Sequence, residues 1–124
     1  TNVDPSNAID VSNPPENVSP IITTSSSPQK VKFAKFLREN NIVMYSAYWC
    51  PHCHDQKQLF GNEAVKELKI VECAQDGKDN DYELCQKKGI RGFPSWEING
   101  EIYSGTRDLN DLASMTGYQG NSNF

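Results

Sequence analysis

The sequence predicts an α/β fold in which a mixed sheet of about four strands is flanked by helices. Three observations support this fold class. Short apolar runs alternate along the chain with segments whose apolar residues recur at helical spacing. The first two predicted strands are joined through a helix, so they form a parallel pair with a right-handed connection. Asn99-Gly100, between two further short runs, predicts a hairpin that adds antiparallel strands.

A helix and a strand are expected first. The helix begins near Pro28, with Ser26 or Ser27 as its N-cap, and Asn40-Asn41 ends it. Its buried face is predicted from four residues at helical spacing: Val31, Ala34, Phe36 and Leu37. Residues 42–47 predict a buried strand, because this run is too short, and too β-branched at its start, for another helix.

A second helix, residues 50–60, follows that strand directly and ends or bends at Gly61. Asn62 can cap a continuation with three inward-facing residues: Ala64, Val65 and Leu68. Residues 70–74 then predict a second strand, and turn residues follow it.

The second half of the chain predicts a helix, the hairpin and a last helix. Residues 81–88 form the short helix, which Gly89 ends as a left-handed cap. Residues 95–98 and 101–103 are the two strands of the hairpin. Asp108 caps the last helix, whose apolar face is Leu109, Leu112 and Ala113.

Composition divides the 124 residues into one domain and two tails. Residues 1–28 hold five of the seven prolines and no aromatic residue, so we expect a flexible tail or linker rich in Ser, Thr, Pro and Asn. Residues 29–118 are the predicted domain, and residues 119–124 a C-terminal tail. The net charge of −4, without any basic run, argues against a nucleic-acid partner.

The cysteine content indicates the compartment. Four cysteines in so short a chain favour an oxidising compartment. No stretch of the sequence approaches the roughly 18 apolar residues of a membrane span. The proline-rich tail is of the kind that tethers a domain to a preceding membrane segment, and we expect this arrangement if the chain is part of a longer protein.

Cys50-Pro51-His52-Cys53 stands where the second helix should begin, directly behind a buried strand. Unpaired N–H groups and the helix dipole would stabilise a thiolate on Cys50, which makes it the candidate nucleophile. Pro51 suits the first helical position. Cys53, one turn further, is the expected resolving thiol. His52 can place positive charge near Cys50, which stabilises the reduced form and makes the disulfide a better oxidant.

Cys73 and Cys85 are a second pair, 12 residues apart. A disulfide closing a loop of that length stabilises the fold by about 3 kcal/mol, so we favour a structural bridge. A second redox pair that relays electrons stays open as the alternative. A zinc module using all four cysteines is a more distant alternative, because the spacing lacks the second close pair common in such sites.

Two stretches of the chain resemble the thioredoxin family. One is residues 47–53, Ala-Tyr-Trp-Cys-Pro-His-Cys, and the other is residues 89–95, Gly-Ile-Arg-Gly-Phe-Pro-Ser. With the second cysteine pair, the sequence is similar to the thioredoxin-like domain fused to vitamin K epoxide reductase homologues of cyanobacteria and plants. That resemblance implies protein thiols as substrates, and a membrane-embedded, quinone-reducing partner that receives the electrons. It also implies an extracytoplasmic location, the periplasm or the thylakoid lumen.

The family resemblance also implies roles for individual residues. Pro94 would be a cis-proline that leaves the Phe93 backbone free to pair with an extended substrate. Trp49 and Phe93 would line the substrate groove, with Tyr48 as a further candidate. Met44 stands where reducing thioredoxins carry an acidic residue, which argues against a reductase. We therefore expect a thiol–disulfide oxidoreductase that donates disulfides to exported proteins, with isomerase or reductase as the alternative. It would work by a redox-active disulfide, with no bound cofactor and no metal.

Overall fold

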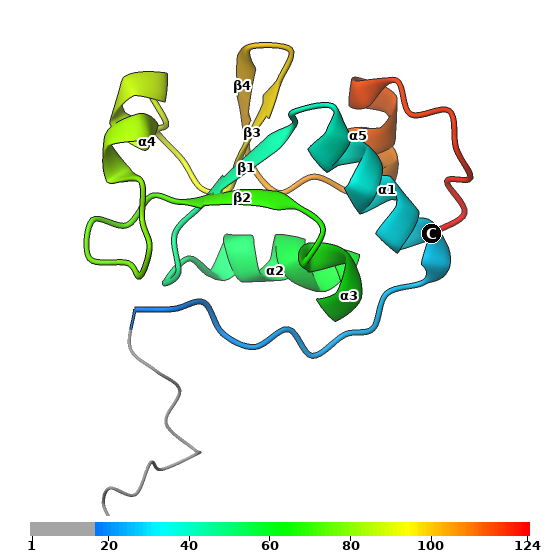
Figure 1. The fold of residues 1–124 in the computed structure, drawn as a ribbon, viewed down its shortest axis with the longest axis horizontal. Helices are drawn as coiled ribbons and strands as arrows, with labels where there is room; N and C mark the ends of the chain where they lie inside the picture. Colours follow the sequence, from blue (N-terminus) through cyan, green and yellow to red (C-terminus); the bar gives the residue numbers. More distant parts are fainter. Residues whose placement is uncertain (1–16) are drawn as a thin grey trace, which may run out of the picture.

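The computed structural model describes residues 17–124 and contains a four-stranded mixed sheet in the order β2-β1-β3-β4 (Figure 1). The strands are β1 (Val43–Ser46), β2 (Lys69–Glu72), β3 (Ser95–Ile98) and β4 (Glu101–Ser104). Strands β1 and β2 are parallel, whereas β1–β3 and β3–β4 are antiparallel. The predicted fold class is confirmed.

The helices come at the predicted places in the chain. They are α1 (Pro28–Glu39), α2 (Pro51–Phe60), α3 (Asn62–Val65), α4 (Tyr82–Lys88) and α5 (Leu109–Thr116). Asp81 accepts a hydrogen bond from the Leu84 N–H at the start of α4, and Gly89 ends that helix with a left-handed φ of 70°. None of the helices within residues 17–124 is both long and apolar enough to cross a bilayer.

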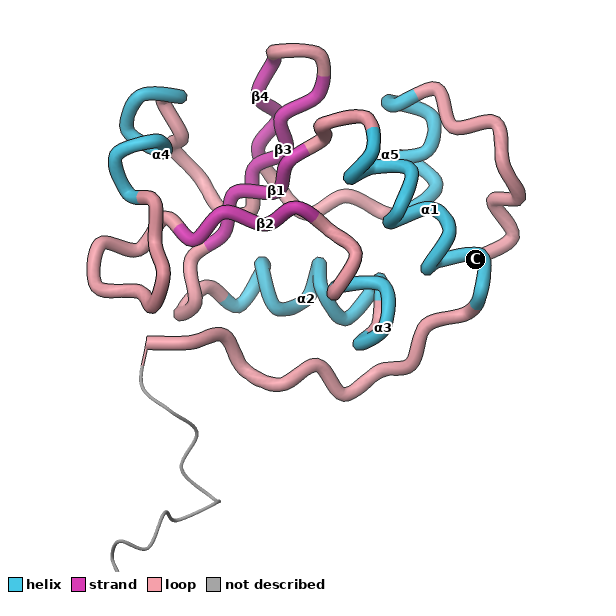
Figure 2. The backbone as a smooth tube through the Cα atoms, in the orientation of Figure 1, coloured by secondary structure: helices cyan, strands magenta, loops and turns pink. Residues whose placement is uncertain are grey.

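The two faces of the sheet are covered differently. Alternate side chains of a strand point to opposite faces, so Met44 and Tyr45 belong to different clusters. Met44 joins the main core, to which α1, α2, α3 and α5 contribute. Tyr45 packs in a smaller cluster with Cys73 and Cys85, and α4 lies apart from the other helices on that side (Figures 1 and 2).

The buried face of helix α1 differs from the predicted one, because Phe33 is its central residue. Ser27 is the N-cap and accepts a hydrogen bond from the Lys30 N–H, as expected for one of the two candidates. The buried residues are Phe33, Ala34 and Leu37, whereas Val31 and Phe36 are only half-buried. Phe33 is fully buried because aromatic rings surround it, including that of Phe60 in α2.

The chain before α1 is packed, so the contacts of the domain begin ahead of the expected boundary at residue 28. Residues 17–27 run along α2 and α3 (Figure 2). The Thr24 hydroxyl donates to the Gln58 carbonyl at 2.7 Å, and the Ser26 hydroxyl donates to the Phe60 carbonyl at 2.8 Å. These polar contacts, which need no apolar side chain, hold a segment that composition predicts to be flexible. Residues 1–16 of the predicted tail lie outside the described residues.

The cap of α3 also comes from this segment. The sequence predicts Asn62 as the cap, but Gly61 occupies the N-cap position and supplies no side chain. The Ser26 hydroxyl instead accepts a hydrogen bond from the Ala64 N–H at 2.9 Å. Gly61 has φ of 93°, and a Cβ there would meet the Ser26 hydroxyl at 2.5 Å, so only glycine fits where the segment crosses.

The residues after α5 fold back on the first helix. The Phe124 ring lies 5.0 Å from that of Phe33, and the Tyr118 ring lies 4.8 Å from it. Phe124 belongs to residues 119–124, which the sequence predicts as a tail. Its ring is partly buried against the main core, so this segment is also in contact with the domain.

Candidate functional site

Cys50 lies at the N-terminus of α2, directly after the loop that leaves β1. It is the N-cap residue, with extended backbone dihedrals, and Pro51 occupies the first helical position. The Cys53 N–H donates a hydrogen bond to the Cys50 sulfur at 3.2 Å. The sulfur is thus held at the end of the helix that stabilises negative charge.

The two thiols of this pair differ in their surroundings. Both are free, with 6% of Cys50 and 1% of Cys53 exposed. Burial raises the pKa of the Cys53 thiol to about 12, and its hydrogen bond with Cys50 acts in the same direction. Cys53 therefore stays protonated near neutral pH unless a neighbouring group takes its proton.

The Phe93–Pro94 loop lies against Cys50, although 43 residues separate Cys50 from Phe93. The peptide bond between Phe93 and Pro94 is cis. The Cys50 thiol donates to the Phe93 carbonyl oxygen at 3.6 Å. The Phe93 ring meets the Trp49 ring edge-on at 5.9 Å, and Trp49 is 58% exposed. An apolar aromatic surface and a backbone carbonyl thus flank the sulfur.

Tyr48 is held more firmly than Trp49. Its hydroxyl donates to the Asp76 carboxylate at 3.0 Å, and its N–H donates to the Glu72 carboxylate at 3.1 Å. The ring packs against the main core and is half-buried. These contacts fix Tyr48 as part of the scaffold beneath the aromatic surface.

The His52 ring is exposed and lies next to a carboxylate. Its Nδ1 is 3.9 Å from the Asp55 carboxylate, one turn along α2, and 76% of the side chain is exposed. The His52 carbonyl accepts a hydrogen bond from the Thr106 hydroxyl, which ties the start of α2 to the loop before α5. When protonated, His52 carries its charge at the same end of α2 as Cys50.

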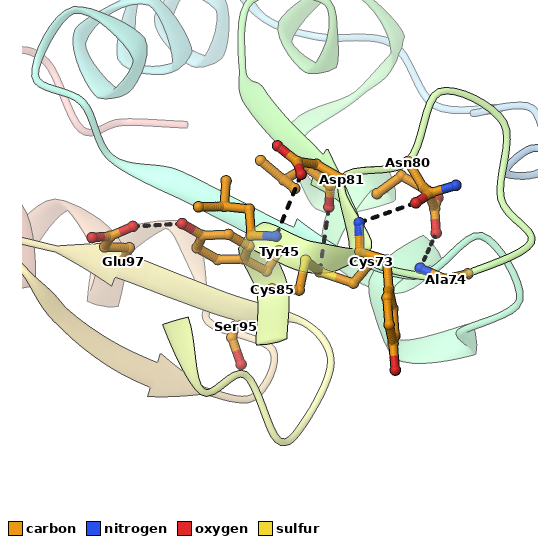
Figure 3. Close-up of a disulfide and its surroundings, with 12 residues drawn as sticks. Tyr45, Cys73, Ala74, Asn80, Asp81, Cys85, Ser95 and Glu97 are labelled. Atoms are coloured by element: carbon orange, nitrogen blue, oxygen red, sulfur yellow. Dashed lines mark hydrogen bonds between the residues drawn. A yellow bond between two sulfur atoms is a disulfide. The ribbon is translucent and has the colours of Figure 1, made fainter. Parts of the chain in front are cut away.

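Cys73 and Cys85 form a disulfide between the end of β2 and helix α4 (Figure 3). Their Cα atoms are 5.7 Å apart, and each residue is 4% exposed. The bridge packs in the cluster of Val43 and Tyr45, and the Tyr45 hydroxyl donates to the Glu97 carboxylate at 2.6 Å. Sulfurs bonded to each other are not thiolate ligands, which argues against the four-cysteine zinc alternative. Residues 17–124 contain no group of three or more His, Cys, Asp or Glu side chains arranged to hold a metal ion.

Two polar residues next to the cysteines were missed by the sequence reasoning. Gln56 is fully buried, and its amide oxygen accepts hydrogen bonds from the Trp96 ring and from the Arg107 N–H. Lys57 is 7% exposed, and its ammonium donates to the Ser19 hydroxyl at 2.9 Å. Both follow Cys53 at helical spacing, and this spacing indicates that they lie on the same buried face of α2 as Cys53.

The sequence profile of the thioredoxin family matches residues 23–116, about three quarters of the chain. This chain belongs to the thioredoxin family. The family assignment agrees with the mixed sheet and with helix α2 starting at a Cys-x-x-Cys pair.

Several curated relatives of this thioredoxin-family chain have names that refer to disulfide chemistry. The thiol-disulfide oxidoreductase LTO1 of Arabidopsis thaliana is 45% identical over 100 residues, which are 78% of this chain and 27% of LTO1. Mouse protein disulfide-isomerase A5 is 32% identical over 63 residues, 48% of this chain and 12% of that protein. Arabidopsis glutaredoxin-C4 is 28% identical over 111 residues, 84% of this chain and 82% of that protein. The chain thus spans about a quarter of LTO1 and a smaller share of the isomerase.

Proposed function

We propose that this chain is a thiol–disulfide oxidoreductase that donates disulfides to protein thiols through Cys50 and Cys53. The observation that carries the proposal is the position of the Cys50 sulfur. It accepts a backbone N–H at the start of α2 and lies beside the Phe93 carbonyl and the exposed Trp49. The names of the relatives support the class of reaction.

In the proposed reaction the oxidised protein holds a Cys50–Cys53 disulfide. A substrate thiolate attacks the Cys50 sulfur, the bond between Cys50 and Cys53 breaks, and the electron pair leaves on Cys53. A second substrate thiol then attacks the mixed disulfide and releases Cys50. The substrate leaves with a disulfide, and both cysteines of the protein are left reduced.

The direction of electron flow rests on two residues. His52 lies two residues after Cys50 and, when protonated, places positive charge at the start of α2, which favours the thiolate and therefore the reduced form. Met44, in β1, is fully buried and brings no carboxylate to the inner side of the pair. Both features favour an oxidant over a reductase. Isomerase activity is the second candidate, favoured by the similarity to protein disulfide-isomerase A5.

The substrates are then exported proteins, and a membrane-embedded quinone-reducing partner reoxidises the site. The Cys73–Cys85 disulfide supports an extracytoplasmic, oxidising location. The similarity to LTO1, a protein almost four times as long as the matched segment, is consistent with a further domain that acts with this one.

The redox equilibrium of Cys50 and Cys53 against glutathione tests the direction. We expect the reduction potential of the Cys50–Cys53 pair to lie well above the thioredoxin value of about −270 mV. It should be closer to the value of a strong periplasmic oxidant, about −120 mV. The oxidised fraction is read from tryptophan fluorescence, because Trp49 directly precedes Cys50, with Cys50→Ser as the unreactive control. A potential close to that of thioredoxin would reject the donor role and favour a reductase.

A further inference from the structure

Lys57 is a buried cation on the inner side of the cysteine pair. It follows Cys53 by four residues in α2, and side chains at this spacing are neighbours on one face of a helix. Both residues are almost fully buried, at 1% for Cys53 and 7% for Lys57. Lysine is rarely buried without a partner, because removing its ammonium from water is unfavourable.

The surroundings of Lys57 connect it to solvent. A hollow of about 390 Å³ opens beside it and is lined by Ser19, Ile70, Glu72 and Lys78, among others. The Lys57 ammonium donates to the Ser19 hydroxyl, and Glu72 is fixed by the N–H groups of Tyr48 and Ala74. Lys57 therefore has the thiol of Cys53 one helical turn away and a polar opening beside it.

Titratable groups surround Lys57 and the hollow beside it. Cys53 in α2, Cys50 at its N-cap and Glu72 at the end of β2 interact electrostatically with Lys57, and the hollow is also lined by Lys78 and Asp79 from the loop after β2. Burial lowers the pKa of the Lys57 ammonium, while negative charge on Cys53, Glu72 and Cys50 opposes that change. An ammonium with a lowered pKa gives up its proton more readily than an exposed lysine does.

We propose that Lys57 is the acid–base partner of Cys53. When a substrate thiolate attacks Cys50, a sulfur–sulfur bond forms between them and the Cys50–Cys53 bond breaks. The electron pair remains on Cys53, and the Lys57 ammonium gives its proton to that sulfur. Lys57, now a neutral amine, regains a proton from solvent through the hollow beside Glu72. In reverse, the amine takes the proton from Cys53 as this thiol attacks a mixed disulfide.

This assignment fills a role that the strand leaves empty. Met44 brings no titratable group to the pair, whereas a Cys53 thiolate of high pKa is a poor leaving group and a protonated Cys53 thiol is a poor nucleophile. An acid–base group on α2 itself addresses both, because its ammonium protonates the departing sulfur and its amine deprotonates the attacking thiol. The inference rests on Cys50 and Cys53 being the redox pair, and it holds for either direction of electron flow.

The test is the reaction of the oxidised full chain with dithiothreitol, followed by stopped-flow tryptophan fluorescence from about pH 6 to about pH 10. We expect Lys57→Met to slow the reaction about tenfold or more near pH 7. The ratio of wild-type to variant rates should fall toward one as the pH rises and the wild-type lysine loses its proton. Lys66→Met, which removes an exposed lysine, is the matched control and should follow the wild-type profile.

Two outcomes overturn the inference: a wild-type rate for Lys57→Met, or a slowing that stays constant across the pH range, as a purely structural role predicts. Lys57→Gln, which retains a polar group for Ser19, replaces the methionine variant if that variant fails to fold. Cys50→Ser in the same assay separates this inference from the proposed function. Reaction of that variant at the wild-type rate would reject the redox site itself, whereas its inactivity with an unaltered Lys57→Met profile rejects only the role of Lys57.

Discussion

The two cysteine pairs are similarly buried, yet their neighbours suit them to opposite tasks. Cys50 lies beside a backbone carbonyl and an exposed tryptophan, whereas Cys73 and Cys85 are bonded to each other in an apolar cluster beneath α4. The first pair spans one turn at the start of a helix, and the second joins β2 to a separate helix. The surroundings of a sulfur, more than its exposed area, thus separate the candidate reactive cysteines from the structural ones.

Replacing the nucleophile should give the largest effect. Cys50→Ser should reduce disulfide exchange about 10³-fold or more, because a serine hydroxyl does not form the mixed disulfide. Exchange is measured with a reduced, unfolded test protein, and the control is the double variant Cys73→Ala/Cys85→Ala. If exchange survived in Cys50→Ser and disappeared in the control, Cys73 and Cys85 would be the redox pair, and Cys50 and Cys53 would not.

Removing the second pair should affect stability instead. Cys73→Ala/Cys85→Ala should lower the free energy of unfolding by about 3 kcal/mol, because the bridge closes a loop between residues 12 apart. Urea denaturation gives this value, and the exchange rate of the same variant should remain close to that of the wild type. A large change in the Cys50–Cys53 potential would instead support the second-redox-pair alternative.

The inner thiol should titrate far from neutrality. In Cys50→Ser, thiolate absorbance should rise only well above pH 9, because burial, the larger cause of the raised Cys53 pKa, remains. The neutral Cys53 thiol favours the folded state at low pH, and this contribution to the free energy of unfolding disappears as the pH rises from about 9 toward about 12. Cys50→Ser/Cys53→Ser is the blank. A titration near the free-thiol value of about 8.5 would contradict the buried position of Cys53.

The smallest effect is expected beneath the disulfide. Tyr45→Phe should lower the free energy of unfolding by about 1 kcal/mol, since it removes a buried donor to Glu97. Hydrogen bonds from Tyr45 and Lys88 lower the pKa of Glu97, so this contribution is present at neutral pH and disappears as the pH falls through that lowered pKa. Tyr103→Phe, which loses an exposed bond to Glu101, should leave stability unchanged. Equal effects of the two variants would show that burial of Tyr45 is unimportant.

The elements and the position of the first cysteine pair followed from local signals. The hairpin was predictable because Asn99, with φ of 52°, adopts a left-handed conformation that asparagine tolerates. Helix α2 and its N-terminal cysteine were predictable because a strand, a proline at the first helical position and a closing glycine occur in order.

Long-range polar contacts were not predictable in the same way. Ser26 and Thr24 are held by groups more than 30 residues away, and nothing in a Ser/Thr-rich stretch specifies its partner. Lys57 belongs to a residue type that is normally exposed, so its identity argued against the buried position that its spacing indicated. Phe124 packs on Phe33, although most of the chain separates them in sequence. A single aromatic residue in a polar segment does not indicate that contact.

The strap formed by residues 17–27 determines where this domain can be cut for expression alone or in a fusion protein. A version cut at Pro28 would lose the Ser26 hydroxyl that caps α3 and the Ser19 hydroxyl that holds the Lys57 ammonium. Gly61 leaves room for residues 25 and 26 of the strap, and without them its flexible backbone would join α2 to α3 with no packing against it. An excised domain should therefore start no later than residue 17, and a linker to any fusion partner should be joined ahead of that position.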